Sequence, residues 1–204
     1  MKIICVGKNY EVPAGEAGTE VQNEPVVFTK PDSALLRNND PFYIPEWTSE
    51  VFYEIELVIR INRIGKNIEE KFAHRYYDEI GLGIDFTAND VLQQLKEKGL
   101  PWEKAKAFDQ SAVLSSTFLP KSIFPDVDSI FYKLDINGDT AQEGDSGLMA
   151  FSFEELIAYI SKYMTLKIGD LIFTGTPAGT GLVNIGDHIE GYLENKKLLD
   201  FMVK

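Results

Sequence analysis

The stretch Glu50-Val51-Phe52-Tyr53-Glu54-Ile55-Glu56-Leu57-Val58-Ile59-Arg60-Ile61 decides the fold class of this chain. It is rich in β-branched and aromatic residues, which favour strands because they pack well on a pleated surface. Its apolar and polar residues alternate only in part, as is typical of a strand with neighbours on both faces. We therefore predict a central strand over 50–61.

Short strands and a few helices surround this segment in the sequence. Helical spacing, capping residues and stop signals predict helices from about Ile68 to Tyr77, from Thr87 to Lys98, and from the capping box Ser152-x-x-Glu155 to about Met164. Further strands are predicted for the opening residues and for 26–28, 80–84, 171–173 and 189–193, with hairpin turns at Asn137-Gly138 and Asn195-Lys196. Because strands outnumber helices, we expect an α+β fold dominated by a rolled or barrel-like sheet.

The composition is that of an ordinary globular protein. The 204 residues are 44% hydrophobic and 25% charged, which fits one large domain. With 32 acidic and 20 basic residues the net charge is −12, so we expect no nucleic-acid partner. No apolar run approaches the roughly 20 residues of a membrane helix, and the first five residues are too short for a signal peptide. We expect a cytoplasmic protein with no membrane partner, and a buried Cys5 without chemistry.

Two glutamates of the predicted central strand point to the same face. Successive strand side chains alternate, so Glu54 and Glu56 lie side by side. In a buried strand two neighbouring carboxylates repel each other, and burial raises this cost unless a cation neutralises them. An edge strand with a solvated acidic face is the alternative that spacing alone leaves open.

A third acid favours the cation. Asp85 follows the apolar stretch 80–84 and stands just before a predicted helix. Three carboxylates without neighbouring cysteines or histidines form a hard oxygen site, which favours Mg²⁺ or Mn²⁺ over Zn²⁺, while Ca²⁺ also fits. An octahedral ion held in this way keeps about three positions for water or substrate. We predict that Glu54, Glu56 and Asp85 bind a divalent metal ion, provided that the fold brings Asp85 to the glutamates.

Several short motifs occur in a fixed order along the chain, and together they resemble the fumarylacetoacetate hydrolase family. Within that family the resemblance is closest to the small acylpyruvate hydrolase and oxaloacetate decarboxylase branch. Each motif alone is weak, but the ordered set covers the chain essentially end to end. The motifs are Val6-Gly7-Lys8-Asn9-Tyr10, Phe28-Thr29-Lys30-Pro31, Tyr53-Glu54-Ile55-Glu56, Asp85-Phe86-Thr87-Ala88-Asn89-Asp90, Gly99-Leu100-Pro101-Trp102, Gln142-Glu143-Gly144 and Thr174-Gly175-Thr176-Pro177-Ala178-Gly179-Thr180-Gly181.

This resemblance implies a fold, an assembly and a substrate class. It implies a mixed β-sheet roll like the C-terminal domain of the family, with a few short helices, and a homodimer. It implies a Mg²⁺ or Mn²⁺ ion held by the acids that match Glu54, Glu56 and Asp85. It also implies a small-molecule 2-oxo acid substrate, or its enol, which chelates the metal through the carboxylate and the adjacent oxygen.

The resemblance further assigns residues that contact the substrate. Lys106 matches the family lysine and would stabilise an enolate charge, and Thr176 would hold a substrate carboxylate. Gln142 and Lys30 are weaker substrate-binding assignments, and Lys30 also fits a purely structural role. Without the resemblance, we would interpret Lys106 as a solvated surface lysine and residues 174–181 as an ordinary turn-rich loop.

The chain departs from the family in the loop from Gly7 to Glu24, which we expect to be a lid or else a passive surface excursion. Hydrolytic members carry a His four residues after the Asn of the Gly-Arg/Lys-Asn-Tyr motif, and a Glu three residues later. Here Pro13 and Glu16 hold these positions, so the pair that would activate water is half missing and Glu16 remains as a candidate catalytic acid or base.

Three further positions bear on the chemistry. Asn89 stands where many relatives carry Arg, which removes one contact to an anionic substrate. The histidines His74 and His188 are expected to be surface or structural residues rather than substitute bases.

These residues predict a divalent-metal-dependent enzyme that acts on 2-oxo acids or their enols by decarboxylation, tautomerisation or C–C hydrolysis. Because hydrolysis also needs a base that delivers water, we expect decarboxylation or tautomerisation to prevail. The alternatives are a family member that binds metal and a keto acid without turnover, and a β-rich interaction module without metal. We expect a single catalytic domain over 1–204, with an N-terminal strand and lid in 1–50 and a metal-binding roll in 51–204.

Overall fold

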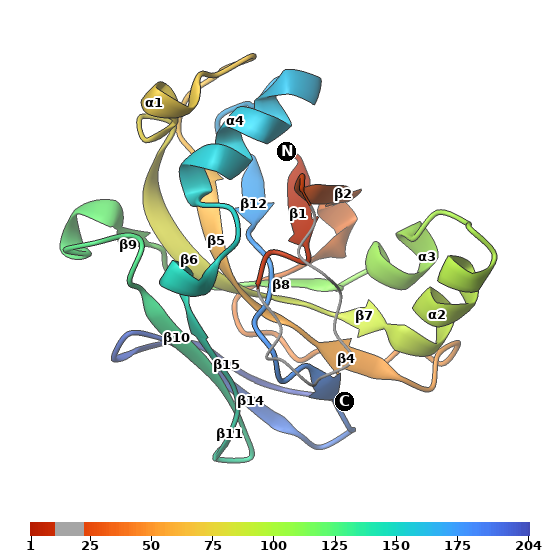
Figure 1. The fold of residues 1–204 in the computed structure, drawn as a ribbon. Coiled ribbons are helices and arrows are strands. Elements are labelled where there is room, and N and C mark those ends of the chain that lie inside the picture. The colour runs from red at the N-terminus through yellow and green to blue at the C-terminus, as the bar shows by residue number, and fades with distance from the viewer. Residues whose placement is uncertain (11–22) are drawn as a thin grey trace.

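The computed structural model describes residues 1–10 and 23–204 (Figure 1). Its largest sheet is mixed and has eight strands in the order β2-β1-β12-β5-β6-β8-β3, with β9 paired to β6. These strands are β1 (Ile3–Gly7), β2 (Val26–Lys30), β3 (Leu35–Leu36), β5 (Ile55–Ile61), β6 (Tyr77–Asp85), β8 (Ala112–Leu114), β9 (Leu119–Pro120) and β12 (Leu171–Phe173). Strands from both ends of the chain therefore meet in one sheet.

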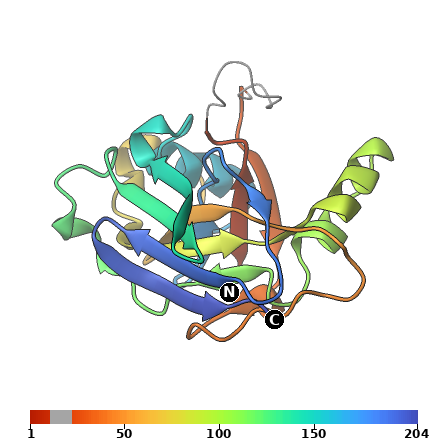
Figure 2. The ribbon, with the colours of Figure 1, turned by 90° about the horizontal axis from the view of Figure 1, so that it is seen from below.

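Two smaller sheets complete the roll. An antiparallel sheet has the order β11-β10-β14-β15, and a three-stranded sheet has the order β13-β4-β7. The first contains β10 (Phe131–Ile136), β11 (Asp139–Asp145), β14 (His188–Leu193) and β15 (Lys196–Met202), and the second contains β4 (Val51–Tyr53), β7 (Thr87–Ala88) and β13 (Gly181–Leu182). Figure 2 shows the four-stranded sheet packed across the large one.

The pair β5 and β6 lies at the centre of the large sheet. The two strands run antiparallel, with Ile55 opposite Ile84 and Glu56 opposite Gly83. A Cβ atom at Gly83 would lie only 2.3 Å from the ring of Phe173, so this position requires glycine for the close approach of the aromatic ring. The register fixes the ends of both strands, where the predicted metal ligands stand.

Apolar side chains cover both faces of the large sheet. On one face Leu57 and Leu82 pack with Ile189 and Phe201 of the four-stranded sheet. On the other face a second cluster contains Ile3, Cys5, Ala34, Val58, Ala112, Leu114, Phe118, Leu171 and Phe173. The β-branched and aliphatic run of β5 therefore belongs to a strand buried on both sides, and Cys5 is a buried free thiol as predicted.

Four α-helices lie at the edges of the described structure: α1 (Glu70–Ala73), α2 (Asn89–Glu97), α3 (Glu103–Lys106) and α4 (Phe153–Tyr163). The predicted capping box of α4 is present, because the Ser152 hydroxyl accepts from the Glu155 N–H and the Glu155 carboxylate accepts from the Ser152 N–H. Helices α1 and α4 lie side by side, and α2 and α3 form a separate pair beside β4 and β7 (Figure 1).

Several predicted boundaries are wrong, and the helix predicted from Thr87 begins at Asn89 because Thr87 and Ala88 form β7. The helix predicted from Ile68 to Tyr77 is only the single turn Glu70–Ala73, because Tyr77 begins β6 and packs edge-on against Phe153 at 5.6 Å. The strand predicted over 50–61 is interrupted at Glu54, where the chain passes from the three-stranded sheet into the large one. The turn predicted at Asn195-Lys196 lies one residue earlier, and its Glu194 has a positive φ of 51°.

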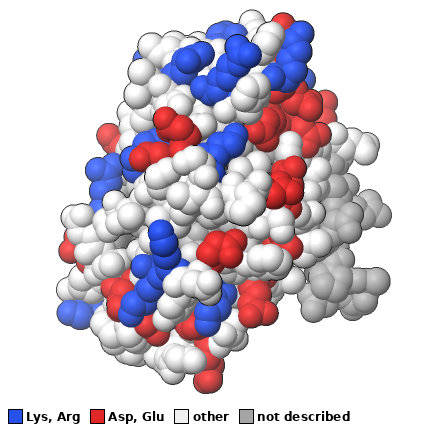
Figure 3. All heavy atoms as spheres, turned by 90° about the vertical axis from the view of Figure 1, so that its left-hand side faces the viewer, with Lys and Arg blue, Asp and Glu red and all other residues white. Residues whose placement is uncertain are grey.

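The fold class is confirmed: a curled mixed sheet with few helices. None of the described helices is long and apolar enough to span a membrane. On the face that Figure 3 shows, lysine and arginine side chains are mixed with aspartate and glutamate.

Candidate metal and active site

The three carboxylates predicted to bind metal come together. One oxygen from each of Glu54, Glu56 and Asp85 lies within 4.8 Å of the others. The backbone N–H of Asp85 donates a 2.8 Å hydrogen bond to the carbonyl of Glu54, so the end of β6 faces the start of β5. Glu56 and Asp85 are buried and Glu54 is half-buried. The condition on which the sequence prediction depended is therefore met.

Lys106, the last residue of α3, lies against two of these acids. Its Nζ is 2.8 Å from Glu54 Oε2 and 3.1 Å from Asp85 Oδ2, and it donates a 2.6 Å hydrogen bond to the Thr87 hydroxyl. Thr87 in turn donates to Glu54 Oε1 at 2.7 Å. Burial alone would lower the pKa of Lys106, but the charges of Asp85 and Glu54 together raise it above its ordinary value. Lys106 is therefore a buried, permanently charged ammonium group.

Lys30 is a second buried cation at the same place. Its Nζ lies 2.7 Å from Asp85 Oδ1 but outside hydrogen-bonding geometry, because the ammonium donates to the Ser111 hydroxyl at 3.0 Å, the Ser111 carbonyl and the Lys106 carbonyl. Asp85 Oδ1 is thus a buried oxygen without a hydrogen-bond donor among the described groups. Lys30 was predicted as a weak substrate contact, yet in the structure it is fully buried and contacts the acid and the loop behind it.

These contacts show that the residues fit a divalent cation. The three acids face two buried lysines, so one negative charge stays uncompensated when all five groups are ionised. Burial, together with the charges of Asp85 and Glu54, raises the pKa of Glu56 well above its ordinary value, and only a 2.7 Å hydrogen bond from the Gly175 N–H and the charge of Lys106 oppose this. Carboxylate oxygens are the ligands that Mg²⁺ and Mn²⁺ prefer, and Asp85 Oδ1, which accepts no hydrogen bond from the described groups, points to the same requirement.

The loop after β12 holds the other side of the site. The Thr174 hydroxyl donates to the Leu57 carbonyl at 3.0 Å, and Gly175 has a φ of +98° that places its N–H on Glu56. The buried side chain of Asn9 donates to the Thr174 carbonyl at 2.8 Å and also bonds the backbone of Phe151. Asn9 therefore positions the loop rather than contacting a ligand.

Gln142, on β11, connects this loop to the metal-binding strand. Its Oε1 accepts a 3.0 Å hydrogen bond from the Ile55 N–H, the residue between the two glutamates. Its Nε2 donates to the Thr176 hydroxyl and to the Pro177 carbonyl, both at 3.0 Å. Because the Thr176 oxygen accepts from Gln142, its own proton is free to be donated into the cavity.

The site contains one cavity of about 290 Å³, near the lower end of ligand pockets, which span roughly 300–1,000 Å³. The metal-binding acids, Lys106, Thr176 and Thr180 line it together with aromatic and aliphatic side chains. Two further lysines, Lys8 and Lys96, also line it and are exposed to solvent. With a divalent cation on the three acids, the cavity would suit a small anionic molecule.

The predicted acid or base Glu16 and the replaced position Pro13 lie outside the described residues, as does most of the predicted lid. Neither histidine lines the cavity. His74 follows α1 and is exposed, and His188 begins β14. The expectation that neither serves as a substitute base is consistent with these positions.

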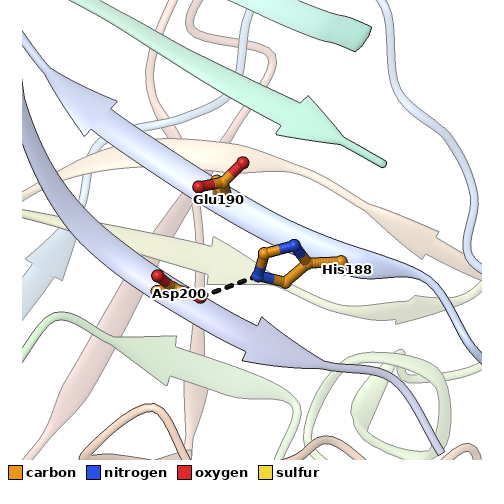
Figure 4. Close-up of side chains that lie close together, drawn as sticks. All are labelled: His188, Glu190 and Asp200. Carbon is orange, nitrogen blue, oxygen red and sulfur yellow. Dashed lines mark hydrogen bonds and ion pairs between the residues drawn. The ribbon is translucent and has the colours of Figure 1, made fainter. Parts of the chain in front are cut away.

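His188 belongs to a second group of potential metal ligands, with Glu190 and Asp200 (Figure 4). His188 Nε2 lies 2.7 Å from Asp200 Oδ1, and Lys197 bridges Glu190 at 2.9 Å and Asp200 at 2.6 Å. The ammonium of Lys197 thus pairs with both acids and neutralises one of their two charges, and the group is half-exposed on the four-stranded sheet, where solvent screens the other charge. We interpret it as a surface ion-pair network, and it offers a control for the buried site.

Sequence reasoning missed several residues of the site. Thr87 could have been found, because it stands two residues after Asp85 and strand periodicity places both on one face. Leu92 and Lys96 could also have been found, because they are four residues apart on α2 and share a helix face. The contacts of Lys30 with Asp85 and Ser111 join segments far apart in the chain, and no local signal indicates them.

Comparison with known proteins identifies relatives along nearly the whole chain. The family model described as fumarylacetoacetate (FAA) hydrolase C-terminal matches residues 2–201. A mitochondrial oxaloacetate tautomerase of Mus musculus is 39% identical over 202 residues, which cover 99% of this chain and 91% of that protein. An oxaloacetate tautomerase of Escherichia coli (strain K12) is 39% identical over 189 residues, which cover 92% and 86% of the two chains.

A solved structure agrees with these relatives. A fumarylpyruvate hydrolase from Pseudomonas aeruginosa, in complex with Mn²⁺ and pyruvate, superposes with a TM-score of 0.92 at 32% identity and covers 100% of this chain and 88% of that one. The family model, the full-length relatives and the shared fold agree with the ordered motifs seen in the sequence, and the chain belongs to the fumarylacetoacetate hydrolase family.

Proposed function

We propose that this chain is a divalent-metal-dependent enzyme that acts on small 2-oxo acids through their enols. The observation that carries the proposal is the convergence of Glu54, Glu56 and Asp85 beside the buried ammonium of Lys106, in a cavity of the size of a small organic acid. Relatives named as an oxaloacetate tautomerase and a fumarylpyruvate hydrolase support the substrate class, and the Mn²⁺ of the latter supports a divalent ion.

In this proposal Glu54, Glu56 and Asp85 hold Mg²⁺ or Mn²⁺. When bound, such an ion acts as a Lewis acid toward the oxygens of a 2-oxo acid. The remaining chemistry belongs to the side chains. Lys106 holds a fixed positive charge where an enolate oxygen would gain its negative charge, which lowers the barrier to removing a proton from C3.

Thr176 binds the carboxylate of the substrate in the same proposal. Its oxygen is engaged by Gln142, so its hydroxyl proton is directed to a ligand. Gln142 positions this hydroxyl and does not itself line the cavity. Lys30 orients Asp85 from behind, which changes its predicted role from substrate contact to positioning residue.

Tautomerisation and decarboxylation are the reactions that this chain supports best. Both require an enolate to form and be protonated, whereas C–C hydrolysis also requires a base that delivers water. The family histidine for that task is replaced by Pro13, and Glu16 is the remaining candidate acid or base for moving the C3 proton. The homodimer and the single catalytic domain are part of the same proposal and rest on the family.

The proposal is tested with purified protein stripped by EDTA and reloaded with Mg²⁺ or Mn²⁺. We expect oxaloacetate to be tautomerised or decarboxylated only after reloading, faster than acetylpyruvate is hydrolysed. Glu56→Gln should abolish this activity, and Glu190→Gln, in the second acidic cluster, should not change it. Activity that survives EDTA, or acetylpyruvate cleaved faster than oxaloacetate is converted, would contradict the proposal.

The replacement of the histidine by Pro13 favours one alternative, a family member that binds metal and a keto acid without turnover. Calorimetry separates the two cases. Saturable binding of pyruvate to the Mn²⁺-loaded protein, with no conversion of any 2-oxo acid, would favour the binding protein.

A further inference from the structure

The outer part of the site cavity carries two cations that the proposed mechanism does not use. Lys8 and Lys96 line the same cavity as the metal-binding acids, but both are exposed, whereas Lys106 is buried. They therefore lie at the rim of the cavity. Lys8 has a positive φ of 60°, an uncommon backbone conformation for a residue with a side chain, and the buried Asn9 beside it holds the chain in place.

The rim lysines carry positive charge that the described residues do not neutralise. The ion pairs formed within 1–10 and 23–204 include neither Lys8 nor Lys96. Burial, and then the charges of Lys106 and Lys8, lower the pKa of Lys96, and the charge of Glu54 opposes this only in part. The three ammonium groups thus repel one another across the cavity, which an anion placed between them would relieve.

The wall between the metal-binding acids and the rim is apolar. Phe28 and Trp102 meet edge to face with ring centroids 6.2 Å apart, and Lys96 Nζ lies 5.7 Å from the Trp102 ring. Leu92 is buried on the cavity side, one turn before Lys96 on α2. A ligand that spans the cavity would therefore contact the metal-binding acids at one end, apolar side chains in the middle and the two rim lysines at the other end.

The start of α2 supplies no positive charge to the cavity. Asn89 donates to the carboxylate of Glu50 at 3.1 Å and accepts from Gln93 at 3.2 Å, and it does not line the cavity. The positive charge on the cavity side of α2 comes instead from Lys96, seven residues and two helical turns later.

We propose that Lys96, with Lys8, forms an anion subsite that binds a second carboxylate of the substrate and so selects dicarboxylic over monocarboxylic 2-oxo acids. This inference rests on the proposed function, because it assumes that the first carboxylate and the 2-oxo group lie at the metal-binding acids. The substrate class is then a short 2-oxo acid with carboxylates at both ends, separated by a length that the apolar wall sets.

The test compares Lys96→Met with Lys98→Met, which changes a neighbouring exposed lysine that follows α2 and does not line the cavity. Lys96→Met should raise KM for oxaloacetate about fivefold, the effect of one solvent-exposed ion pair, and leave kcat within about twofold. The inhibition constant of pyruvate, which has the head group alone, should not change in either variant. Adding salt should weaken oxaloacetate binding in the wild type more than in Lys96→Met.

Equal behaviour of the two variants, or an equal loss of pyruvate and oxaloacetate binding in Lys96→Met, would overturn the subsite and leave the proposed function standing. A wild-type protein without metal-dependent turnover would instead overturn the proposed function. In that case calorimetric titration of the Mn²⁺-loaded protein with both acids still decides the subsite: Lys96→Met must weaken oxaloacetate selectively, and any other result contradicts it.

Discussion

The side-chain amide of Gln142 donates a 3.0 Å hydrogen bond to the hydroxyl of Thr176. The same side chain accepts from the N–H of Ile55, which stands between two of the metal-binding acids. One residue of β11 thus fixes the distance between the metal-binding strand and the loop proposed to hold the substrate carboxylate.

Gln142→Leu should therefore weaken substrate binding and stability together. The change leaves the buried N–H of Ile55 and the carbonyl of Pro177 without partners, which costs about 1–3 kcal/mol of unfolding free energy. KM should rise because the Thr176 hydroxyl is no longer oriented. Urea unfolding and steady-state kinetics check this, with the exposed neighbour Glu143→Gln as control. Unchanged KM in Gln142→Leu would show that Thr176 does not depend on it.

Lys106→Met should separate catalysis from metal binding. The variant loses the charge proposed to stabilise the enolate, and removing one such group typically lowers kcat about 100-fold. Mn²⁺ binding should be retained or strengthened, because a positive charge 2.8 Å from Glu54 is removed. Calorimetry with Mn²⁺ and oxaloacetate kinetics measure the two effects. A variant that keeps full kcat would remove Lys106 from the mechanism.

Lys30→Met should destabilise the metal-free protein strongly. It leaves the buried carboxylate of Asp85 with one cation fewer and the Ser111 hydroxyl without its donor, and breaking a buried ion pair costs about 3–5 kcal/mol. Bound Mn²⁺ should restore part of this loss. The control is Lys71→Met, which breaks an exposed pair with Glu69 and should cost less than about 1 kcal/mol. Equal unfolding free energies for the two variants would mean that Lys30 does not balance Asp85.

Acid should weaken the junction between the N-terminus and the loop before β12. Burial alone would raise the pKa of Asp170, but hydrogen bonds from Lys2 and from the Lys167 N–H hold it below the ordinary value. The stabilisation is therefore present above the ordinary Asp pKa of about 3.9 and is lost as the pH falls through the lower, folded value. Asp170→Asn should make unfolding free energy less dependent on pH in this acid range. A variant with the wild-type pH profile would contradict this assignment.

The parts of the fold that the sequence predicted well are set by local chemistry. The capping box of Ser152 and Glu155 starts α4, and the apolar run 171–173 forms β12 with the predicted bounds. The wrong boundaries arise where pairing or packing with residues far away in the sequence determines the local structure. The sequence predicts that Tyr77 ends a helix. In the structure the pairing of β6 with β5 and the contact of Tyr77 with Phe153 place this residue in a strand. The sequence predicts that Glu54 lies in the middle of one strand, whereas in the structure the chain passes there from one sheet into another.

The site residues likewise fall into those that the sequence indicates and those that only the folded structure brings together. The spacing of Glu54 and Glu56 and the position of Asp85 at the end of an apolar stretch indicate the three carboxylates, and the register of β5 and β6 brings Asp85 to the glutamates. Lys106, Gln142 and Thr176 entered by family resemblance, because nothing near them in sequence distinguishes them from surface residues. The ion pair between Lys30 and Asp85 joins segments far apart in the sequence, so no local pattern predicts it.

The central claim is that Glu54, Glu56 and Asp85 together bind one divalent cation, and Mn²⁺ titration followed by calorimetry tests it most directly. We predict one Mn²⁺ per chain for the wild type, binding at least about tenfold weaker in Glu56→Gln and Asp85→Asn, and no change in His188→Ala of the surface cluster. Mn²⁺ binding that survives both carboxylate substitutions, or that is lost in His188→Ala, would contradict the claim.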